Sequence, residues 1–84
     1  MSVEIIAVPK AGLGPMWVIL DSEIKGIEGP LSFEWSFGDG SSSNDIKPGS
    51  RLFEFGTYSV VLEVTDRGGK KHTASVTIDA SSPG

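Results

Sequence analysis

The segment from Phe33 to Gly40 constrains the fold of this chain more than any other. Its first five residues alternate between apolar and polar side chains, with aromatic residues at 33, 35 and 37. A period of two is typical of a β-strand with one buried face. The Gly-Asp-Gly that follows ends the strand, because glycine tolerates positive φ and Asp-Gly favours a tight turn. Each aromatic side chain can bury about 150–250 Å², so we place this strand at the centre of the core.

Alternating or β-branched segments recur along the rest of the chain and are separated by turn residues. Strands are expected at residues 3–8, 16–20, 31–37, 51–55, 57–65 and 72–80, with a short turn of helix or strand at 23–27. In the strand at 57–65 the inward side chains are those of Tyr58, Val60, Leu62 and Val64. About seven short strands, with a turn signal every 8–12 residues and no helical period, predict an all-β sandwich or barrel.

The length of 84 residues fits one domain, which we place at residues 1–80. The last four residues, Ser81-Ser82-Pro83-Gly84, are typical of a linker or tail. Met1 is followed directly by a strand-like segment, so we expect no signal peptide here. No apolar run approaches the ~20 residues that a spanning helix needs, so we expect no membrane insertion. These features favour one module of a longer chain.

The charged and reactive residues narrow the classes of function. Seven basic and 11 acidic side chains leave a net charge of −4, which argues against nucleic acid or an anionic membrane as partner. No cysteine and a single histidine argue against zinc and against nucleophilic catalysis. That histidine, His72, follows Lys70-Lys71 and is expected to be exposed on a basic hairpin tip, which is solvated or contacts a phosphate or acidic polymer. We therefore expect no catalytic residue and no cofactor.

The loop after the central strand is the one segment with a pattern that a metal site would need. Asp39, Ser41, Ser43 and Asp45 place oxygen atoms at alternate positions, as the start of an EF-hand loop does. That loop also requires glycine at its sixth position and a bidentate glutamate at its twelfth, and this chain has asparagine and serine there. We therefore interpret Asp39-Gly40 as a turn in which the carboxylate accepts backbone hydrogen bonds, and we expect no metal.

Three segments together resemble the polycystic kidney disease (PKD) domain. Trp35-Ser36-Phe37-Gly38-Asp39-Gly40 resembles the W-D-F-G-D-G signature of that family. The segment Gly56–Asp66 resembles its G-x-Y-x-V-x-L-x-V-x-D strand, and Gly14–Ser22 resembles its P-x-x-V-x-F-x-x-S segment. The resemblance runs from about Val3 to Ile78 and implies a seven-stranded, immunoglobulin-like β-sandwich. The signature residues it implies are Trp35, packed between the sheets, Phe37, Gly38, Asp39, Gly40, Gly56 and Tyr58, the last as a tyrosine corner.

The chain departs from the family pattern at three places. Serine stands at position 36, where the signature has aspartate. The family's H-x-Y/F segment corresponds to residues 50–55, where the histidine is missing and only aromatic packing through Phe53 or Phe55 is carried over. In some PKD-like modules paired aspartates before the central strand contribute to a calcium site, and residues 23–28 lack them. The resemblance therefore implies no calcium site here.

Trp17 and Ile19 are the residues most suggestive of binding. The resemblance turns Val18 and Leu20 toward the core, which leaves Trp17 and Ile19 on the outer face of the same strand. Exposed tryptophan is favoured at binding hot spots, and contiguous outer apolar area marks partner sites. Two alternatives stay open, because residues 21–30 could cover Trp17 or the strand could have the opposite register.

The resemblance implies a function as well as a fold. PKD-like modules serve as spacers or interaction modules in cell-surface proteins and secreted hydrolases. The chain is therefore expected to be a non-catalytic, extracellular adhesion, spacer or protein-interaction module, beside neighbouring domains of a larger chain. One alternative is a carbohydrate- or polymer-binding module that uses Trp17 as a stacking platform. Another is a virion or surface-layer structural protein, which predicts self-assembly.

Overall fold

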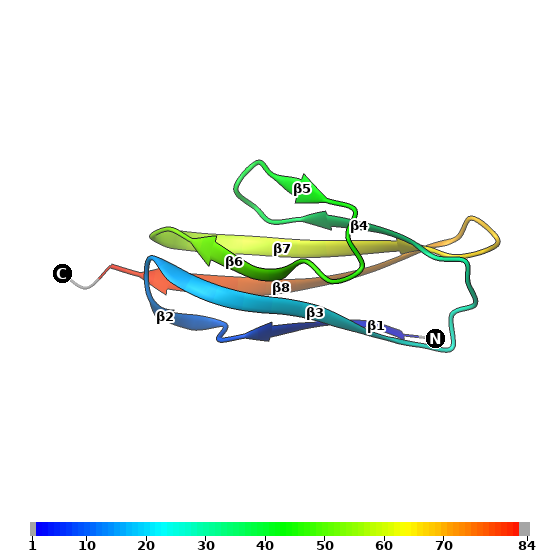
Figure 1. Cartoon of the computed structure of the whole chain (residues 1–84), viewed down its shortest axis with the longest axis horizontal. Helices are drawn as coiled ribbons and strands as arrows, with labels where there is room; N and C mark the ends of the chain where they lie inside the picture. The colour runs from blue at the N-terminus through cyan, green and yellow to red at the C-terminus, as the bar shows by residue number, and fades with distance from the viewer. Residues whose placement is uncertain (1, 83–84) are drawn as a thin grey trace.

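In a computed structural model, the described part of the chain, residues 2–82, contains eight strands and no helix (Figure 1). The all-β prediction is confirmed. Met1, Pro83 and Gly84 lie outside the described residues, and part of the expected tail at 81–84 lies there with them. The strands are β1 (Ser2–Val8), β2 (Ala11–Leu13), β3 (Met16–Lys25), β4 (Ser32–Ser36), β5 (Ser42–Ser43), β6 (Gly49–Phe53), β7 (Gly56–Thr65) and β8 (Lys71–Ser81).

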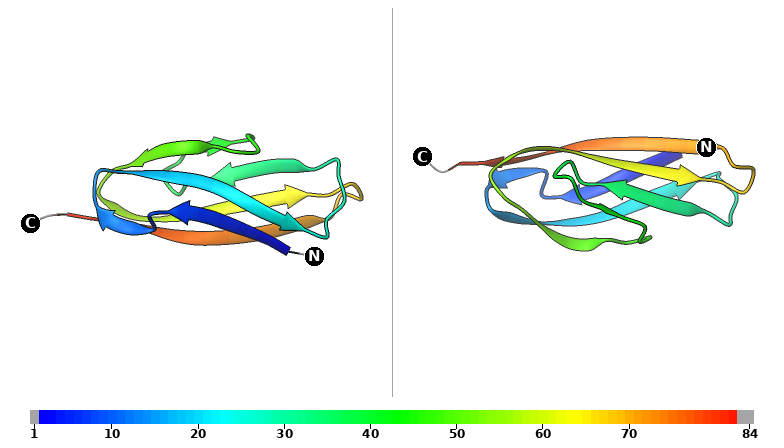
Figure 2. Two further views of the ribbon diagram at one scale, coloured as in Figure 1. Left: turned by 60° about the horizontal axis from the view of Figure 1, so that its bottom comes forward. Right: turned by 90° about the horizontal axis from the view of Figure 1, so that it is seen from above.

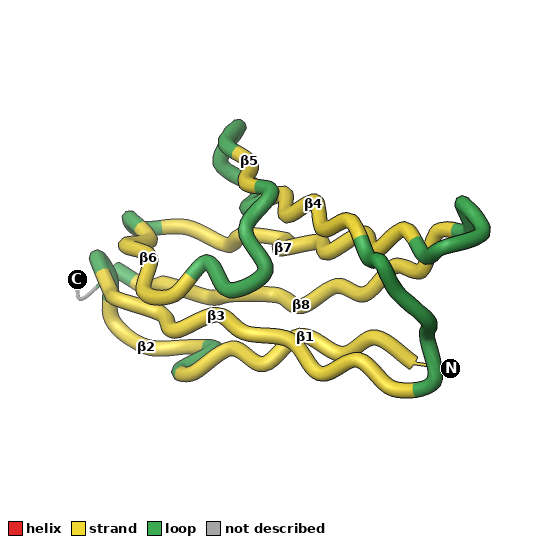
Figure 3. The backbone as a smooth tube through the Cα atoms, turned by 45° about the vertical axis from the view of Figure 1, so that its right-hand side comes forward, coloured by secondary structure: helices red, strands yellow, loops and turns green. Residues whose placement is uncertain are grey.

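The strands form two stacked sheets (Figure 2). One sheet has the order β1-β3-β6 and the other the order β2-β8-β7-β4-β5. All pairings are antiparallel except that of β2 with β8. The chain crosses from the five-stranded to the three-stranded sheet between β5 and β6 (Figure 3). The immunoglobulin-like sandwich is therefore confirmed.

Two segments expected as connections contain strand, and of the helix or strand left open at 23–27 the structure shows strand as far as Lys25. β2 lies between the strands predicted at 3–8 and 16–20, and β5 lies in the loop after the central strand. β3 continues past residue 20 to Lys25, because the whole length of β1 pairs with its second half. The pairing runs from Val8 opposite Ile19 to Ser2 opposite Lys25. These pairings join residues far apart in sequence, so the local pattern of side chains does not report them.

The core lies between the sheets, and the central strand β4 supplies its largest side chains. Trp35 is completely buried, and its ring lies nearly parallel to that of Phe37, with centroids 6.3 Å apart. A buried indole N–H needs an acceptor, and Trp35 Nε1 donates to the carbonyl oxygen of Asp45 at 2.9 Å. The loop after β5 is thereby held against the core. The buried apolar residues are Ala7, Met16, Val18, Leu20, Phe33, Trp35, Phe37, Phe53, Val60, Leu62, Val64, Ile78 and Ala80.

Tyr58, near the start of β7, makes the contact expected of a tyrosine corner. Its hydroxyl donates to the carbonyl oxygen of Phe55 at 3.4 Å, so it returns to the backbone just upstream. Its ring lies 5.1 Å from that of Phe53. Phe53 is buried while Phe55 is half exposed, so Phe53 provides the aromatic packing that the sequence left open between the two.

Candidate functional site

The outward surface of the three-stranded sheet carries the largest group of exposed apolar side chains that adjacent strands bring together. β3 buries Met16, Val18 and Leu20, and its period of two turns Trp17 and Ile19 outward, where they are 63% and 59% exposed. An exposure this large shows that residues 21–30 do not cover Trp17. We call the whole group the outer apolar face; it consists of Ile6 and Val8 on β1, Trp17 and Ile19 on β3, and Leu52 on β6.

The strand register makes the outer apolar face continuous. Val8 lies directly opposite Ile19, and Trp17 lies directly opposite Leu52. Side chains directly opposite in an antiparallel pair have Cβ atoms about 4.5–5.5 Å apart. Ile6 adjoins Val8 on the same face of β1, two residues earlier. The sequence indicated Trp17 and Ile19 alone, because the other three residues join them only through these pairings.

Charged and polar groups border the outer apolar face. Ser50 lies opposite Ile19, and Asp21 lies opposite Ile6. Lys47 Nζ approaches Asp21 Oδ2 at 3.8 Å, and farther along β3 the Nζ of Lys25 lies 3.2 Å from Oε1 of Glu23. An apolar centre with an aromatic residue and a polar rim is the usual anatomy of a protein interface. This arrangement therefore has the features of a binding surface.

The Asp39 turn uses its polar atoms internally. The Asp39 carboxylate accepts hydrogen bonds from the N–H of Ser41 at 3.0 Å, from the Ser41 hydroxyl, and from Arg51 at 3.2 Å. The Ser41 hydroxyl, with the Ser41 N–H and the Arg51 guanidinium, holds the pKa of Asp39 below its ordinary 3.8, although burial opposes the shift. The guanidinium also lies 4.0 Å from the centroid of Phe37. This geometry fits a structural turn that is tied to the core.

Ser43 and Asp45, the other two residues of the EF-hand-like pattern, form hydrogen bonds with each other. The Ser43 hydroxyl donates to Asp45 Oδ2 at 2.9 Å, and the Asp45 N–H donates to the Ser43 oxygen at 3.1 Å. Within residues 2–82, no group of three or more histidine, cysteine, aspartate or glutamate side chains is placed to hold a metal ion. In the same part of the chain, no helix has the length and apolar character to cross a membrane.

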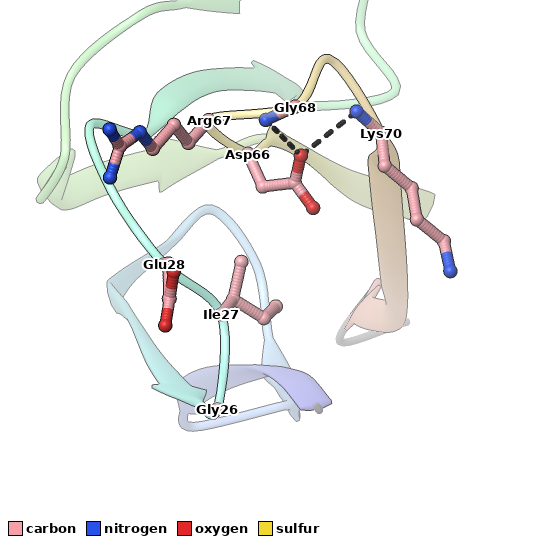
Figure 4. Close-up of a pocket in the computed structure, with 7 residues that line it drawn as sticks. All are labelled: Gly26, Ile27, Glu28, Asp66, Arg67, Gly68 and Lys70. Carbon is pink, nitrogen blue, oxygen red and sulfur yellow. Dashed lines mark hydrogen bonds between the residues drawn. The ribbon is translucent and has the colours of Figure 1, made fainter.

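A pocket of about 750 Å³ lies at the far end of the sandwich, where the β3–β4 connection meets the β7–β8 hairpin (Figure 4). Asp66 organises the hairpin, since its Oδ1 accepts hydrogen bonds from the N–H groups of Gly68 and Lys70, both at 2.9 Å. Its Oδ2 lies 2.9 Å from Nε2 of His72. The lining residues are Gly26, Ile27, Glu28, Asp66, Arg67, Gly68 and Lys70.

The expectation that His72 is exposed was wrong. Its side chain is only 13% exposed and pairs with Asp66. The alternation of β8, which turns Ala74, Val76 and Ile78 inward, also turns His72 inward, so the signal was present in the sequence. The His72 hydrogen bond, followed by those from the Lys70 and Gly68 N–H groups, holds the pKa of Asp66 below its ordinary 3.8. Lys71 stays on the surface and pairs with Glu63 at 3.3 Å.

Comparison with known proteins shows which family and which proteins this chain resembles in sequence. The family model of the PKD domain matches residues 18–80. A microbial collagenase of Vibrio alginolyticus is 44% identical over 54 residues, and collagenase ColA of Clostridium perfringens is 42% identical over 55. These matches cover 64% and 66% of this chain. The pre-pro-metalloprotease PrtV of Vibrio cholerae is 38% identical over 53 residues, 63% of this chain. The matched segments span only 7%, 4% and 6% of these relatives' lengths.

Two solved structures share the fold. The crystal structure of the PKD1 domain from the Vibrio cholerae metalloprotease PrtV superimposes with a TM-score of 0.68 at 24% identity, covering 98% of this chain and all of that one. A structure of carbohydrate-binding modules from the β-sandwich superfamily gives 0.67 at 24% identity, covering 99% of this chain and 36% of that one. At this level of identity the two likenesses establish the architecture alone.

Proposed function

Because this chain belongs to the PKD domain family, we propose that it is a non-catalytic accessory module of a larger extracellular protein, and that it contacts a protein partner through the outer apolar face. The match to collagenases and a metalloprotease over a small fraction of their lengths supports a module that serves an enzyme without performing its chemistry. Extended proteins such as collagen are then natural partners to test.

The observation that carries this proposal is the exposure of Trp17 within a continuous apolar surface. Its side chain is 63% exposed and lies between Ile19 on its own strand and Leu52 on the neighbouring strand. A buried aromatic side chain removes about 150–250 Å² from water, and burial is worth about 25 cal/mol per Å². Because Trp17 is 63% exposed, a partner that covers it gains the burial of that exposed part.

The shape of the sandwich supports a role as a spacer as well. The principal extents are 49 × 21 × 16 Å, and the first and last described residues lie near opposite ends of the long axis (Figure 1). The long strands β3, β7 and β8 run along that axis. A domain of this shape holds the segments before and after it apart, and it leaves the outer apolar face free along its side.

A carbohydrate partner is the second candidate, and the environment of Trp17 favours it. A tryptophan on a flat sheet surface offers its ring to a sugar, and Ser50 and Asp21 provide polar groups on the same face. The two candidates use the same surface but different probes. Fibrillar collagen tests the protein partner, and an insoluble polysaccharide such as chitin tests the carbohydrate partner.

Cosedimentation with collagen fibrils and with chitin tests the proposal. We expect Trp17→Ala to weaken collagen binding by about 2 kcal/mol or more, or roughly thirtyfold, because aromatic anchors at interface centres carry this much energy. Ile46→Ala is the matched control, since Ile46 is equally exposed, at 63%, and lies outside the outer apolar face. Chitin binding lost in Trp17→Ala would favour the carbohydrate candidate. Collagen binding that Trp17→Ala leaves unchanged would overturn the proposal for this face.

A further inference from the structure

The outer edge of β8 is mostly unpaired. On one side β8 pairs with β7 from Lys71 to Ala80. On the other side it pairs with β2 over Asp79–Ser81 only. Within the described residues, the edge from 71 to 78 therefore has no partner strand, and it forms one border of the five-stranded sheet (Figure 2).

The direction of the β8 backbone groups follows from one hydrogen bond. The N–H of Asp79 donates to the carbonyl oxygen of Lys10 at 2.8 Å, so it points away from β7. N–H and C=O groups alternate in direction along a strand, and the β7–β8 register is continuous from Lys71 to Ala80. Thr73, Ser75 and Thr77 therefore also point their N–H and C=O groups to the open edge, where each offers one donor and one acceptor.

The core is incompletely covered beside this edge. Where β2 flanks β8, the inward-facing Ile78 and Ala80 are at most 1% exposed. Along the open edge, Ala74 and Val76 also face inward but are only half buried. β1, which lies next to β8, shows the same gradient, because Val3 and Ile5 are half buried while Ala7 is buried.

A groove of about 450 Å³ follows the opening between β1 and β8. Its lining is more polar than apolar, and apolar residues from both sheets, Glu4 and Lys10 all contribute to it. β1 and β8 run in the same direction (Figure 1), so the start of β1, which contains Glu4, lies toward the start of the open edge. Lys10 lies at the end of that edge, where its carbonyl oxygen accepts from the N–H of Asp79. The residues that line the groove are Val3, Glu4, Ile5, Lys10, Thr73, Ala74, Ser75 and Val76.

The edge of β8 lacks the features that normally block strand addition, which are short length, proline, bulges and inward charges. Among the other edge strands described here, β2 and β5 have three and two residues. β6 has five residues and follows Pro48, and β1 ends directly before Pro9. β8 has 11 residues without proline, and on its open part the one lysine, Lys71, and the one histidine, His72, both lie at its start. Among the described strands that have an unpaired side, β8 is the longest.

We propose that an extended segment of a partner protein adds to β8 as a further strand, filling the groove beside β1. Unpaired donors and acceptors repeating every second residue, about 6.8 Å apart, match another strand and not a glycan or a nucleic acid. The segment carries apolar side chains at alternate positions, which cover Val3, Ile5, Ala74 and Val76. The chain's own β2 already pairs with the same edge in this way over Asp79–Ser81.

The charges at the groove give the expected polarity of the bound strand. A segment parallel to β8, like β2, places its first residues beside Glu4 and its last residues beside Lys10. A basic residue at its start and an acidic residue at its end complement these two side chains. We therefore choose the capped peptide acetyl-Lys-Thr-Val-Thr-Val-Thr-Glu-amide as the probe.

Amide hydrogen exchange followed by NMR, with a parallel titration of affinity, tests this inference on the 84-residue chain. We expect the amides of Thr73, Ser75 and Thr77 to exchange fast in the free protein and at least roughly tenfold more slowly with saturating peptide, because each gains an acceptor. The same peptide, N-methylated at the alternate residues whose N–H groups face β8, loses those hydrogen-bond donors. It is expected to bind roughly tenfold more weakly.

Two variants at one position separate the backbone from the side chain. Ser75→Pro removes an N–H that makes no bond to β7, so it blocks addition without breaking the existing ladder. We expect it to weaken peptide binding at least roughly tenfold, whereas Ser75→Ala, which keeps the N–H, binds as wild type does. If Ser75→Pro does not fold, the N-methylated peptide decides alone.

Three results would overturn the inference. One is that the amides of Thr73, Ser75 and Thr77 stay unprotected at saturating peptide. Another is that the N-methylated peptide binds as tightly as the unmodified one. The third is a monomer–dimer equilibrium in sedimentation that Ser75→Pro abolishes, because the edge would then pair with a second copy of the chain. Trp17→Ala leaves this groove intact, so failure here and failure of the outer apolar face are measured separately.

Discussion

Nε2 of His72 lies 2.9 Å from Oδ2 of Asp66, and this contact joins the end of β7 to the start of β8. Both side chains are largely covered, at 13% and 17% exposure. The same carboxylate accepts two N–H groups of the hairpin. A single side chain therefore fixes both the turn and the first inward residue of β8.

This contact predicts the direction of a pH effect. The pKa of Asp66 is lower in the folded chain than its ordinary 3.8, so the carboxylate stabilises the fold at pH values above 3.8. That stabilisation is lost as pH falls through the folded pKa, because the carboxyl is then protonated in both states. We expect Asp66→Asn to lower the free energy of unfolding at pH 7, and the difference from wild type to shrink toward zero below pH 3.8. Urea unfolding at pH 7, 5 and 3 measures it; a difference that is constant across this range contradicts the assignment.

Two glycines of the Gly-Asp-Gly turn are expected to differ in their tolerance of alanine. Gly38 has φ of +79°, and a Cβ there would lie 2.7 Å from the carbonyl oxygen of Ser59 and 2.9 Å from its nitrogen. Gly40 has φ of +90° with nothing within 4 Å of a Cβ. Gly40→Ala is expected to lower the free energy of unfolding only by the cost of a left-handed backbone, about 1–2 kcal/mol. Gly38→Ala adds a backbone clash, and we expect it to cost more than about 3 kcal/mol. Urea unfolding of the two variants measures the difference, and equal costs would refute the close approach to β7.

Trp35→Phe is expected to destabilise the chain by about 2–4 kcal/mol, because it removes core volume and leaves the Asp45 carbonyl oxygen without its donor. Trp17→Phe provides the matched control on the surface, where we expect a change within about 0.5 kcal/mol. Denaturant unfolding followed by far-UV circular dichroism compares them, since that signal comes mainly from the backbone. Similar losses for the two variants would mean that Trp17 also has a structural role.

The sequence was sufficient for the central strand and for the outward direction of Trp17. In both strands the side chains alternate between the two faces, so one residue of known direction fixes the direction of all the remaining side chains. Trp35 provided that direction for β4, and for β3 the PKD resemblance provided it by turning Val18 and Leu20 inward. The PKD resemblance was also confirmed, because its motifs are local strings of residues that need no knowledge of pairing.

The extent of the outer apolar face and the open edge of β8 could not be predicted, because both depend on pairings between residues far apart in sequence. Val8 and Leu52 belong to the outer apolar face only because β1 and β6 flank β3 in a particular register. The free edge of β8 exists because β2 has three residues and ends the pairing early. The prediction for His72 was wrong for a different reason, because it rested on the neighbouring Lys70 and Lys71, whereas the alternation of β8 turns the side chain inward.

Acrylamide quenching of tryptophan fluorescence tests most directly whether the outer apolar face is free for a partner. Trp35 is completely buried and Trp17 is 63% exposed, so the wild type is expected to show one protected and one quenchable component. Trp17→Phe is expected to abolish the quenchable component and leave the protected one. If Trp17→Phe leaves the quenching unchanged, or if both tryptophans are protected in the wild type, Trp17 is covered and the proposed binding surface does not exist.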